Sequence, residues 1–166
     1  MANINGTYHL YYSVSTLGQR NSAIGLATSD NMAAGTWTDH GSTGVATTSA
    51  DNFNAIDPSL LDDGGAYYLT FGSFWGGIQQ VRMNSAATKA VTAPVNLAYK
   101  DGDHSIEGSY LYKNGDFYYL FFSEGKCCRL DQAKPPPGGE YKVKVCRSSN
   151  PSGGFVCSSH PLQQYS

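Results

Sequence analysis

Hydrophobic residues gather in three similar segments, each rich in aromatic side chains and each led by a turn that contains glycine. The segments are residues 5–13, 64–73 and 114–123. Their turn glycines, Gly6, Gly65 and Gly115, recur at an interval of roughly 50 to 60 residues. A glycine-containing turn followed by an aromatic-rich run is typical of the second strand of a β-hairpin. The pattern therefore predicts three similar β units.

Further strand-like stretches accompany these segments. An apolar or alternating stretch follows each one, at residues 22–29, 77–83 and 141–148. Two short strands with a carboxylate precede the second and third segments, at residues 55–61 and 105–111. Asp57 and Glu107 each lie eight residues before the turn glycine of their unit. We therefore expect the two carboxylates at the same place in successive units.

A repeat of about 50 residues with three or four short strands is typical of a β-propeller blade. The first strand of each blade lines the central axis, so equivalent residues converge there. The carboxylate position of the first unit would precede Met1, and we expect the first blade to lack its inner strand. Because propellers typically have about 4–8 blades, residues 1–157 are predicted to form an all-β, incomplete propeller of roughly three blades. Residues 158–166 lack the pattern and are predicted to be a separate tail.

Composition excludes several classes of protein. The length of 166 residues suits one domain, and 19 glycines with only 14% charged residues argue against a helical bundle, a coiled coil or disorder. A net charge of −2 without a basic stripe predicts no nucleic-acid partner. No apolar run approaches the roughly 20 residues of a membrane helix. The N-terminus has no signal-peptide pattern, so the signal of a secreted protein would lie outside this chain.

The four cysteines, at positions 127, 128, 146 and 157, lack the spacing of a zinc site. No metal site is therefore predicted. Disulfides are possible, with three connectivities. A bond between the adjacent Cys127 and Cys128 would be strained, so at least one of them is expected to be free. The cysteines therefore do not distinguish an oxidising from a reducing compartment.

Asp57 and Glu107 are the leading candidates for chemistry. Asp57 precedes Pro58, and the commonest role of such a pair is a turn. The apolar residues around it favour instead a buried strand, where an unpaired carboxylate is costly. Glu107 has a similar setting. Two convergent carboxylates in different environments are what the cleavage of a glycosidic bond requires.

The segment Phe74–Trp75, followed by two glycines, allows two interpretations. The aromatic rings either fill space between blades or present a flat face for stacking on a sugar. Asn54 is open to the same alternatives. His104 and the nearby Asp101 and Asp103 lie in a polar loop, where two carboxylates are weak evidence for a calcium site.

Taken in order, several runs resemble glycoside hydrolase family 43, and within it the endo-1,5-α-L-arabinanases. The resemblance covers about residues 4–156, and the Cys-Cys pair followed by a proline-rich loop is most similar to the fungal members. The runs that carry it are residues 11–27, 54–58, 71–77, 106–110 and 127–128.

The resemblance implies a five-bladed propeller that hydrolyses internal bonds of arabinan with inversion, using three carboxylates. Glu107 would be the general acid, and Asp57 would orient it and tune its pKa. The family's general base, an aspartate, matches nothing in this chain and would lie upstream of Met1. The side chains implied to bind substrate are Trp75, Phe74, Asn54 and Ser73.

The same resemblance implies no required cofactor, with a single metal ion near the propeller axis of the full-length parent. It also implies a monomeric, extracellular parent that acts on arabinan or arabino-oligosaccharides and has no membrane partner. Related members use xylan-type substrates, which stay an alternative, as does exo rather than endo cleavage.

The sequence is compatible with three alternative functions. The chain is an arabinan hydrolase that is incomplete and inert alone, a non-catalytic carbohydrate-binding fragment, or an interaction module whose acids are structural. The first two require Asp57 and Glu107 to face one cavity with Trp75 on its wall.

Overall fold

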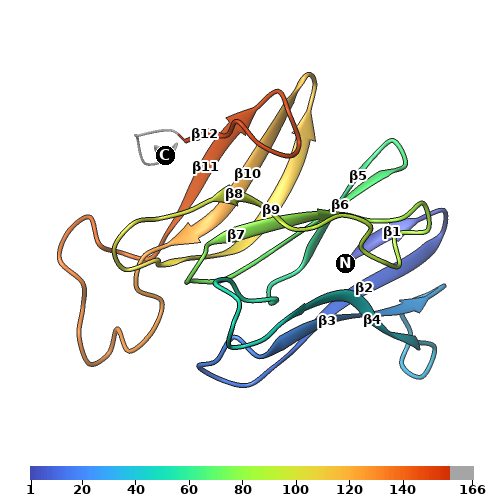
Figure 1. The fold of residues 1–166 in the computed structure, drawn as a ribbon, viewed down its shortest axis with the longest axis horizontal. Coiled ribbons are helices and arrows are strands. Elements are labelled where there is room, and N and C mark those ends of the chain that lie inside the picture. The colour runs from blue at the N-terminus through green and yellow to red at the C-terminus, as the bar shows by residue number, and fades with distance from the viewer. Residues whose placement is uncertain (158–166) are drawn as a thin grey trace.

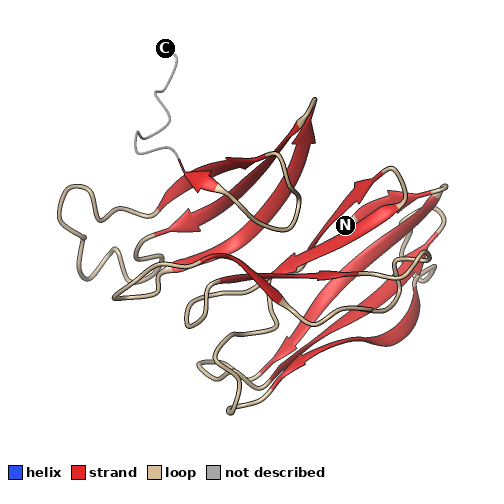
Figure 2. Ribbon diagram, turned by 45° about the horizontal axis from the view of Figure 1, so that its top comes forward, coloured by secondary structure: helices blue, strands red, loops and turns tan. Residues whose placement is uncertain are grey.

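The computed structural model describes residues 1–157, which fold into three four-stranded antiparallel sheets, with strands and loops but no membrane-spanning helix (Figures 1 and 2). Within each sheet the strands follow one another in chain order. The first sheet contains β1 (Ala2–Ile4), β2 (Thr7–Ser15), β3 (Ser22–Ser29) and β4 (Thr38–Thr47). The second contains β5 (Ser59–Asp63), β6 (Ala66–Phe71), β7 (Ile78–Arg82) and β8 (Val95–Ala98). The third contains β9 (Ile106–Asn114), β10 (Phe117–Glu124), β11 (Lys142–Ser148) and β12 (Val156–Cys157).

The three repeated units are confirmed, since each predicted aromatic strand is the second strand of a sheet. The first sheet corrects one expectation. Its first strand is present as β1, three residues long and paired to β2. The predicted tail, residues 158–166, lies outside the described residues.

The predicted equivalence of the two carboxylates depends on an irregularity in β9. Gly65 is the second residue of the β5–β6 turn, whereas Gly115 is the first residue of the β9–β10 turn. Counted from the turns along β5 and β9, Asp57 matches Gly108, and both have a positive φ, +56° and +63°. The register of β9 on β10 shifts by one residue, however, because Tyr110 opposes Phe121 whereas Glu107 opposes Ser123. Counted along the partner strands β6 and β10, Glu107 is therefore the residue that matches Asp57.

Asp57 also lies outside the strand predicted for it. The strand begins only at Ser59, and Asp57 sits in a bend two residues earlier. A left-handed residue cannot continue the pleat of a strand, which explains the shorter element. The bend places Asp57 on a connection, where its side chain is free to face away from the second sheet.

Hydrophobic cores lie on both faces of the second sheet, between it and its two neighbours. In β5, Leu60 packs toward the core shared with the first sheet, whereas Leu61 belongs to the core shared with the third. Successive residues of a strand point to opposite faces, which accounts for this division. All residues from Ile78 to Val81 in β7 are buried, as expected for a strand covered on both sides.

Polar contacts also join neighbouring sheets. The Tyr11 hydroxyl of the first sheet donates to the carbonyl of Ala87, beyond β7, at 2.5 Å. Asp63 of the second sheet accepts from Lys113 at 2.6 Å and from the Tyr118 hydroxyl at 2.5 Å, both in the third sheet. These contacts fix how the sheets lie against one another, and so fix the shape of any cleft between them.

The expectation of a free cysteine is wrong, because all four cysteines form disulfides. Cys146 and Cys157 are direct cross-strand partners in β11 and β12 and are bonded to each other. Cys127 and Cys128 are bonded to each other as well. Strand register decides the pairing, since it commits Cys146 to Cys157 and leaves each adjacent cysteine only its neighbour.

Candidate functional site

A cleft of about 770 Å³ opens where loops of the first two sheets meet the connection that leads to β9. Ser13 and Ser15 from the end of β2 form one side of it. Five of the six residues singled out from the sequence line this cleft: Asn54, Asp57, Ser73, Phe74 and Trp75. Five of the residues singled out from the sequence thus lie together at one cleft.

Glu107, the sixth, is the second residue of β9 and is not part of the wall itself. Ser73 connects it to the cleft, because the Ser73 hydroxyl donates to Glu107 Oε2 at 2.9 Å. The other carboxylate oxygen, Oε1, accepts a hydrogen bond from the Tyr141 hydroxyl at 2.9 Å. Both oxygens of this half-buried carboxylate are therefore held by hydroxyl donors.

Asp57 lies beside Glu107. Its Oδ2 accepts the backbone N–H of Gly108 at 3.2 Å, so the two carboxylates are linked through adjacent residues of β9. Burial raises the pKa of Asp57, the Gly108 hydrogen bond opposes this rise, and the negative charge of Glu107 adds to it. The two acids thus interact electrostatically, as their convergence from the sequence predicted.

The loop that carries Phe74 and Trp75 has an unusual backbone. Phe74 and Trp75 have φ values of +53° and +40°, a region that costs a residue with a side chain about 1–2 kcal/mol. Gly77 closes the loop at φ +71°, and a Cβ on it would lie 2.3 Å from the carbonyl oxygen of Ala98. Only glycine fits there, so the aromatic pair is held by tight backbone packing.

Trp75 separates the cleft from a second hollow of about 610 Å³, and lines both. The guanidinium of Arg20 lies over the Trp75 ring, 5.9 Å from its centroid. Such a cation–π contact restricts the ring. Trp75 is half-buried and presents an aromatic surface at the edge of the cleft, which is what stacking on a sugar requires.

Asn54 is almost fully buried, with 3% of its surface exposed. Its side-chain oxygen accepts a hydrogen bond from the Ser22 hydroxyl at 2.6 Å. Because that oxygen is already engaged, the amide nitrogen is the atom through which Asn54 can contact a ligand. Asn54 therefore offers a fixed hydrogen-bond donor on the wall of the cleft.

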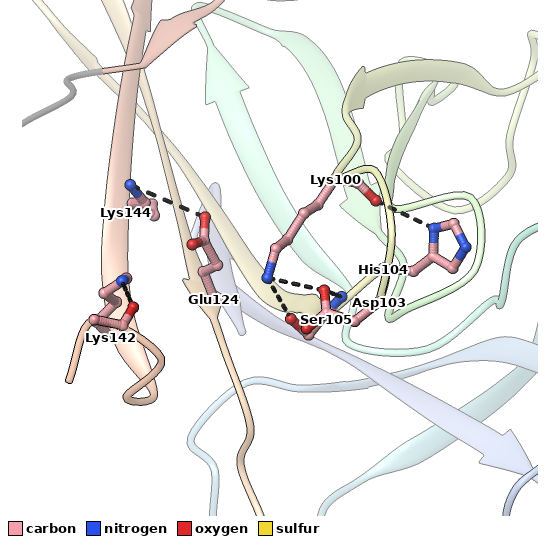
Figure 3. Close-up of polar contacts among 8 residues, drawn as sticks. Lys100, Asp103, His104, Ser105, Glu124, Lys142 and Lys144 are labelled. Atoms are coloured by element: carbon pink, nitrogen blue, oxygen red, sulfur yellow. Dashed lines mark hydrogen bonds and ion pairs between the residues drawn. The ribbon is translucent and has the colours of Figure 1, made fainter. Parts of the chain in front are cut away.

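A charged cluster lies in the connection between β8 and β9 (Figure 3). Lys100 contacts Asp103 Oδ1 at 2.9 Å and donates to the Ser105 hydroxyl at 2.7 Å, while the His104 ring bonds the Lys100 carbonyl at 3.1 Å. Hydrogen bonds from Lys100, and then from Ser105, lower the pKa of Asp103 to about 2. Asp103 reaches the cleft and is ionised at any ordinary pH.

Side chains that could bind a metal ion are not clustered among the described residues. Among residues 1–157 no group of three or more His, Cys, Asp and Glu side chains is arranged to hold a metal ion. The described residues therefore do not form a metal site of this kind by themselves.

Tyr141 is the residue that sequence reasoning missed. It stands directly before β11, at the end of the proline-rich connection. In the sequence it is one of 12 tyrosines and has no local pattern that marks it. Its contact with Glu107 depends on how β9, β10 and β11 lie side by side, and only the folded sheet reveals this.

The known proteins to which this chain is similar are glycoside hydrolases. The family model described as "Glycosyl hydrolases family 43" matches residues 1–163. The chain is 59% identical over 154 residues to the "Probable arabinan endo-1,5-alpha-L-arabinosidase A" of Aspergillus terreus, covering 92% of this chain and 46% of that protein. The chain thus spans about half the length of the curated relatives it matches.

Two solved structures show the same arrangement of sheets. The "GH43 Endo-Arabinanase from Bacillus licheniformis" superposes with a TM-score of 0.82 at 36% identity, covering 93% of this chain and 52% of that one. The Cellvibrio cellulosa α-L-arabinanase "complexed with Arabinohexaose" superposes with a TM-score of 0.76 at 31% identity, covering 93% and 53%.

Proposed function

The chain belongs to glycosyl hydrolase family 43, and from this premise we propose that it carries the general-acid part of a site that hydrolyses internal α-1,5 bonds of arabinan with inversion. One observation supports the proposal above the others. Asp57 lines a cleft that has Trp75 on its wall, and Glu107 lies beside Asp57 and accepts a hydrogen bond from Ser73 of the same wall. An interaction module with purely structural acids would not need this arrangement.

The proposal extends to the fold. We take the three sheets as three successive blades of a five-bladed propeller, whose remaining blades belong to the parent protein. In support, one core joins the first sheet to the second and another joins the second to the third, and the solved arabinanase from Bacillus licheniformis is about twice as long as this chain. The cleft would then lie near the central axis, where the substrate of the complete enzyme binds.

Glu107 is proposed as the general acid. Its carboxyl O–H gives the proton to the glycosidic oxygen while the bond between that oxygen and the anomeric carbon breaks. A water molecule adds to the anomeric carbon from the opposite face and loses its proton to a general base. Acid and base of an inverting enzyme stand about 6.5–9.5 Å apart to leave room for this water.

Asp57 is proposed to orient Glu107. Its own partner, the N–H of Gly108, belongs to the residue after Glu107, so Asp57 fixes the backbone that carries the acid.

The general base is proposed to come from a segment of the parent that this chain does not contain. Asp103 reaches the cleft, but its pKa of about 2 makes it a weak base, and its carboxylate is engaged by Lys100. A general base works best when its pKa lies near the operating pH. We therefore propose that this chain alone does not turn over arabinan.

Substrate contacts are proposed for four residues of the wall. The rings of Trp75 and Phe74 would stack on arabinofuranose units, and the Asn54 amide nitrogen would donate to a sugar hydroxyl. Ser73 would contact the leaving oxygen while it holds Glu107. No cofactor enters this chemistry. We also propose an extracellular parent, in keeping with two disulfides, since disulfides persist in oxidising compartments.

Hydrolysis of linear arabinan tests the proposal. We expect no release of arabino-oligosaccharides by the 166-residue chain, and release by a version extended upstream through a first blade. In the extended version, Glu107→Gln lowers the rate far more than the affinity, whereas Glu124→Gln, at the end of β10, leaves both unchanged.

Other outcomes would contradict parts of the proposal. Turnover by the 166-residue chain would contradict the missing base. Equal losses of rate and affinity in Glu107→Gln would make Glu107 a substrate contact. Binding without turnover in both versions would favour the alternative, a non-catalytic carbohydrate-binding fragment.

A further inference from the structure

We propose that Tyr141 is the positioning residue of the general acid. Its hydroxyl holds Glu107 Oε1 on the side away from the cleft, so that Oε2 is the oxygen that exchanges a proton with the substrate. The inference rests on the proposed role of Glu107 as the acid.

The two carboxylate oxygens of Glu107 lie in different surroundings. Oε2 accepts from Ser73, which lines the cleft, at 2.9 Å. Oε1 accepts from Tyr141, also at 2.9 Å, and Tyr141 does not line the cleft. Of the two oxygens, only Oε2 is bonded to a residue of the cleft wall, so we infer that a glycosidic oxygen bound in the cleft approaches Oε2.

Protonation of Glu107 changes what its neighbours must do. A protonated carboxyl becomes a donor at one oxygen and remains an acceptor at the other. The Ser73 hydroxyl can rotate from donor to acceptor, or give way to the glycosidic oxygen. The Tyr141 bond to Oε1 persists in both states, so it fixes the carboxyl plane while the proton on Oε2 moves.

Tyr141 is itself anchored by the backbone on both sides of its connection. The N–H of Gly125 donates to the carbonyl of Ser105 at 2.9 Å. A Cβ on Gly125 would lie 2.5 Å from the carbonyl oxygen of Glu140, the residue before Tyr141. The two ends of the connection therefore pack closely against each other beside β9. This packing fixes the backbone position of Tyr141, from which its side chain contacts Glu107.

Charges around the phenol support the same arrangement. Burial raises the pKa of Tyr141, and a hydrogen bond with Ser123 opposes this rise. The hydrogen bond to Glu107 and the negative charges of Glu107 and Asp57 raise the pKa further. These groups come from β9, β10 and the connection before β5. The phenol therefore keeps its proton and remains a donor wherever Glu107 is ionised.

A titration of the phenol in the 166-residue chain tests the contact. The protein is labelled with ¹³Cζ-tyrosine, and the Tyr141 signal is assigned from its loss in Tyr141→Phe. We expect Tyr141 to titrate above the ordinary value of 10.0. Glu107→Gln should lower its pKa by about one unit, since a nearby negative charge is removed. The control Glu124→Gln, whose glutamate lies near Lys144, should leave it unchanged.

A binding measurement separates positioning from substrate contact. Calorimetry with a linear α-1,5-arabino-oligosaccharide should give the same dissociation constant for Tyr141→Phe and for the unmodified chain. An affinity loss of about tenfold or more, equivalent to about 1.4 kcal/mol, would make Tyr141 a substrate contact and overturn the inference.

The inference also fails if the Tyr141 pKa does not respond to Glu107→Gln. Its failure is distinct from that of the proposed function. If the unmodified chain binds no arabino-oligosaccharide, the proposed substrate is wrong, while the phenol titration still decides whether Tyr141 holds Glu107.

Discussion

The replacement Tyr11→Phe tests the joint between the first two sheets, from which most of the cleft is built. Tyr11 is 5% exposed, and its hydroxyl donates to the carbonyl of Ala87 at 2.5 Å. Ala87 is fully buried. Phenylalanine keeps the ring in the core and removes only the hydroxyl, so the change leaves a buried carbonyl without its donor and creates almost no cavity.

The size of the effect follows from that single lost bond. Removing one partner of a buried hydrogen bond costs about 1–3 kcal/mol, because the group left behind remains desolvated. For a chain of this length, a loss of about 2 kcal/mol lowers Tm by roughly 4–8 °C. The hydrophobic contribution of the ring is retained, so the loss should not reach the larger values typical of a truncated core residue.

Urea unfolding followed by circular dichroism measures the effect. Tyr11→Phe should lower the midpoint without changing the m-value, which reports the surface exposed on unfolding. Tyr112→Phe is the matched control, because Tyr112 is 50% exposed and its stability should change by less than about 0.5 kcal/mol. Equal stabilities of the two variants would refute the claim that the Tyr11–Ala87 bond joins the sheets.

Three further outcomes are expected. Hydrogen bonds from Lys113 and Tyr118 lower the pKa of Asp63, so the ionised Asp63 stabilises the fold above pH 3.8, and this stabilisation is lost as the pH falls below that value. Asp63→Asn should therefore lower the free energy of unfolding in urea by about 1–3 kcal/mol at pH 7 and by little at pH 2. Replacing both Cys146 and Cys157 by serine should lower the free energy of unfolding by about 2–3 kcal/mol, since their disulfide closes a short loop. Replacing both Cys127 and Cys128 by serine should lower it less, and equal losses of stability would contradict this expectation. Trp75→Ala should weaken arabino-oligosaccharide binding at least tenfold by calorimetry, and an unchanged affinity would remove Trp75 from the site.

The strands were predictable because their signals are local. A turn glycine followed by an aromatic run marks β2, β6 and β10, and the alternation of Leu60 and Leu61 between two cores is the ordinary period of a strand. The wall of the cleft was predictable for a similar reason. Asn54, Asp57 and Trp75 lie in short segments between recognisable strands, where binding residues concentrate.

Contacts that depend on register were not predictable. Asp57 and Glu107 lie close together, but their match between sheets depends on the one-residue shift of β9 against β10, which no local pattern in the sequence reveals. The cysteine pairing depends on β11 lying beside β12. The bonds from Ser73 and Tyr141 to Glu107 each span 34 residues of sequence and arise only once the sheets have packed.

We propose above all that Asp57 and Trp75 line a sugar-binding cleft to which Ser73 joins Glu107. The most direct test is a ¹H–¹⁵N NMR titration of the 166-residue chain with a linear α-1,5-arabino-oligosaccharide. The chain has two tryptophans, and Trp37 lies outside the cleft, so its indole N–H is an internal control. We predict that the Trp75 indole and the Asp57 amide shift with one common dissociation constant while the Trp37 indole stays in place. Absence of any shift, or equal shifts of both indoles, would contradict the claim.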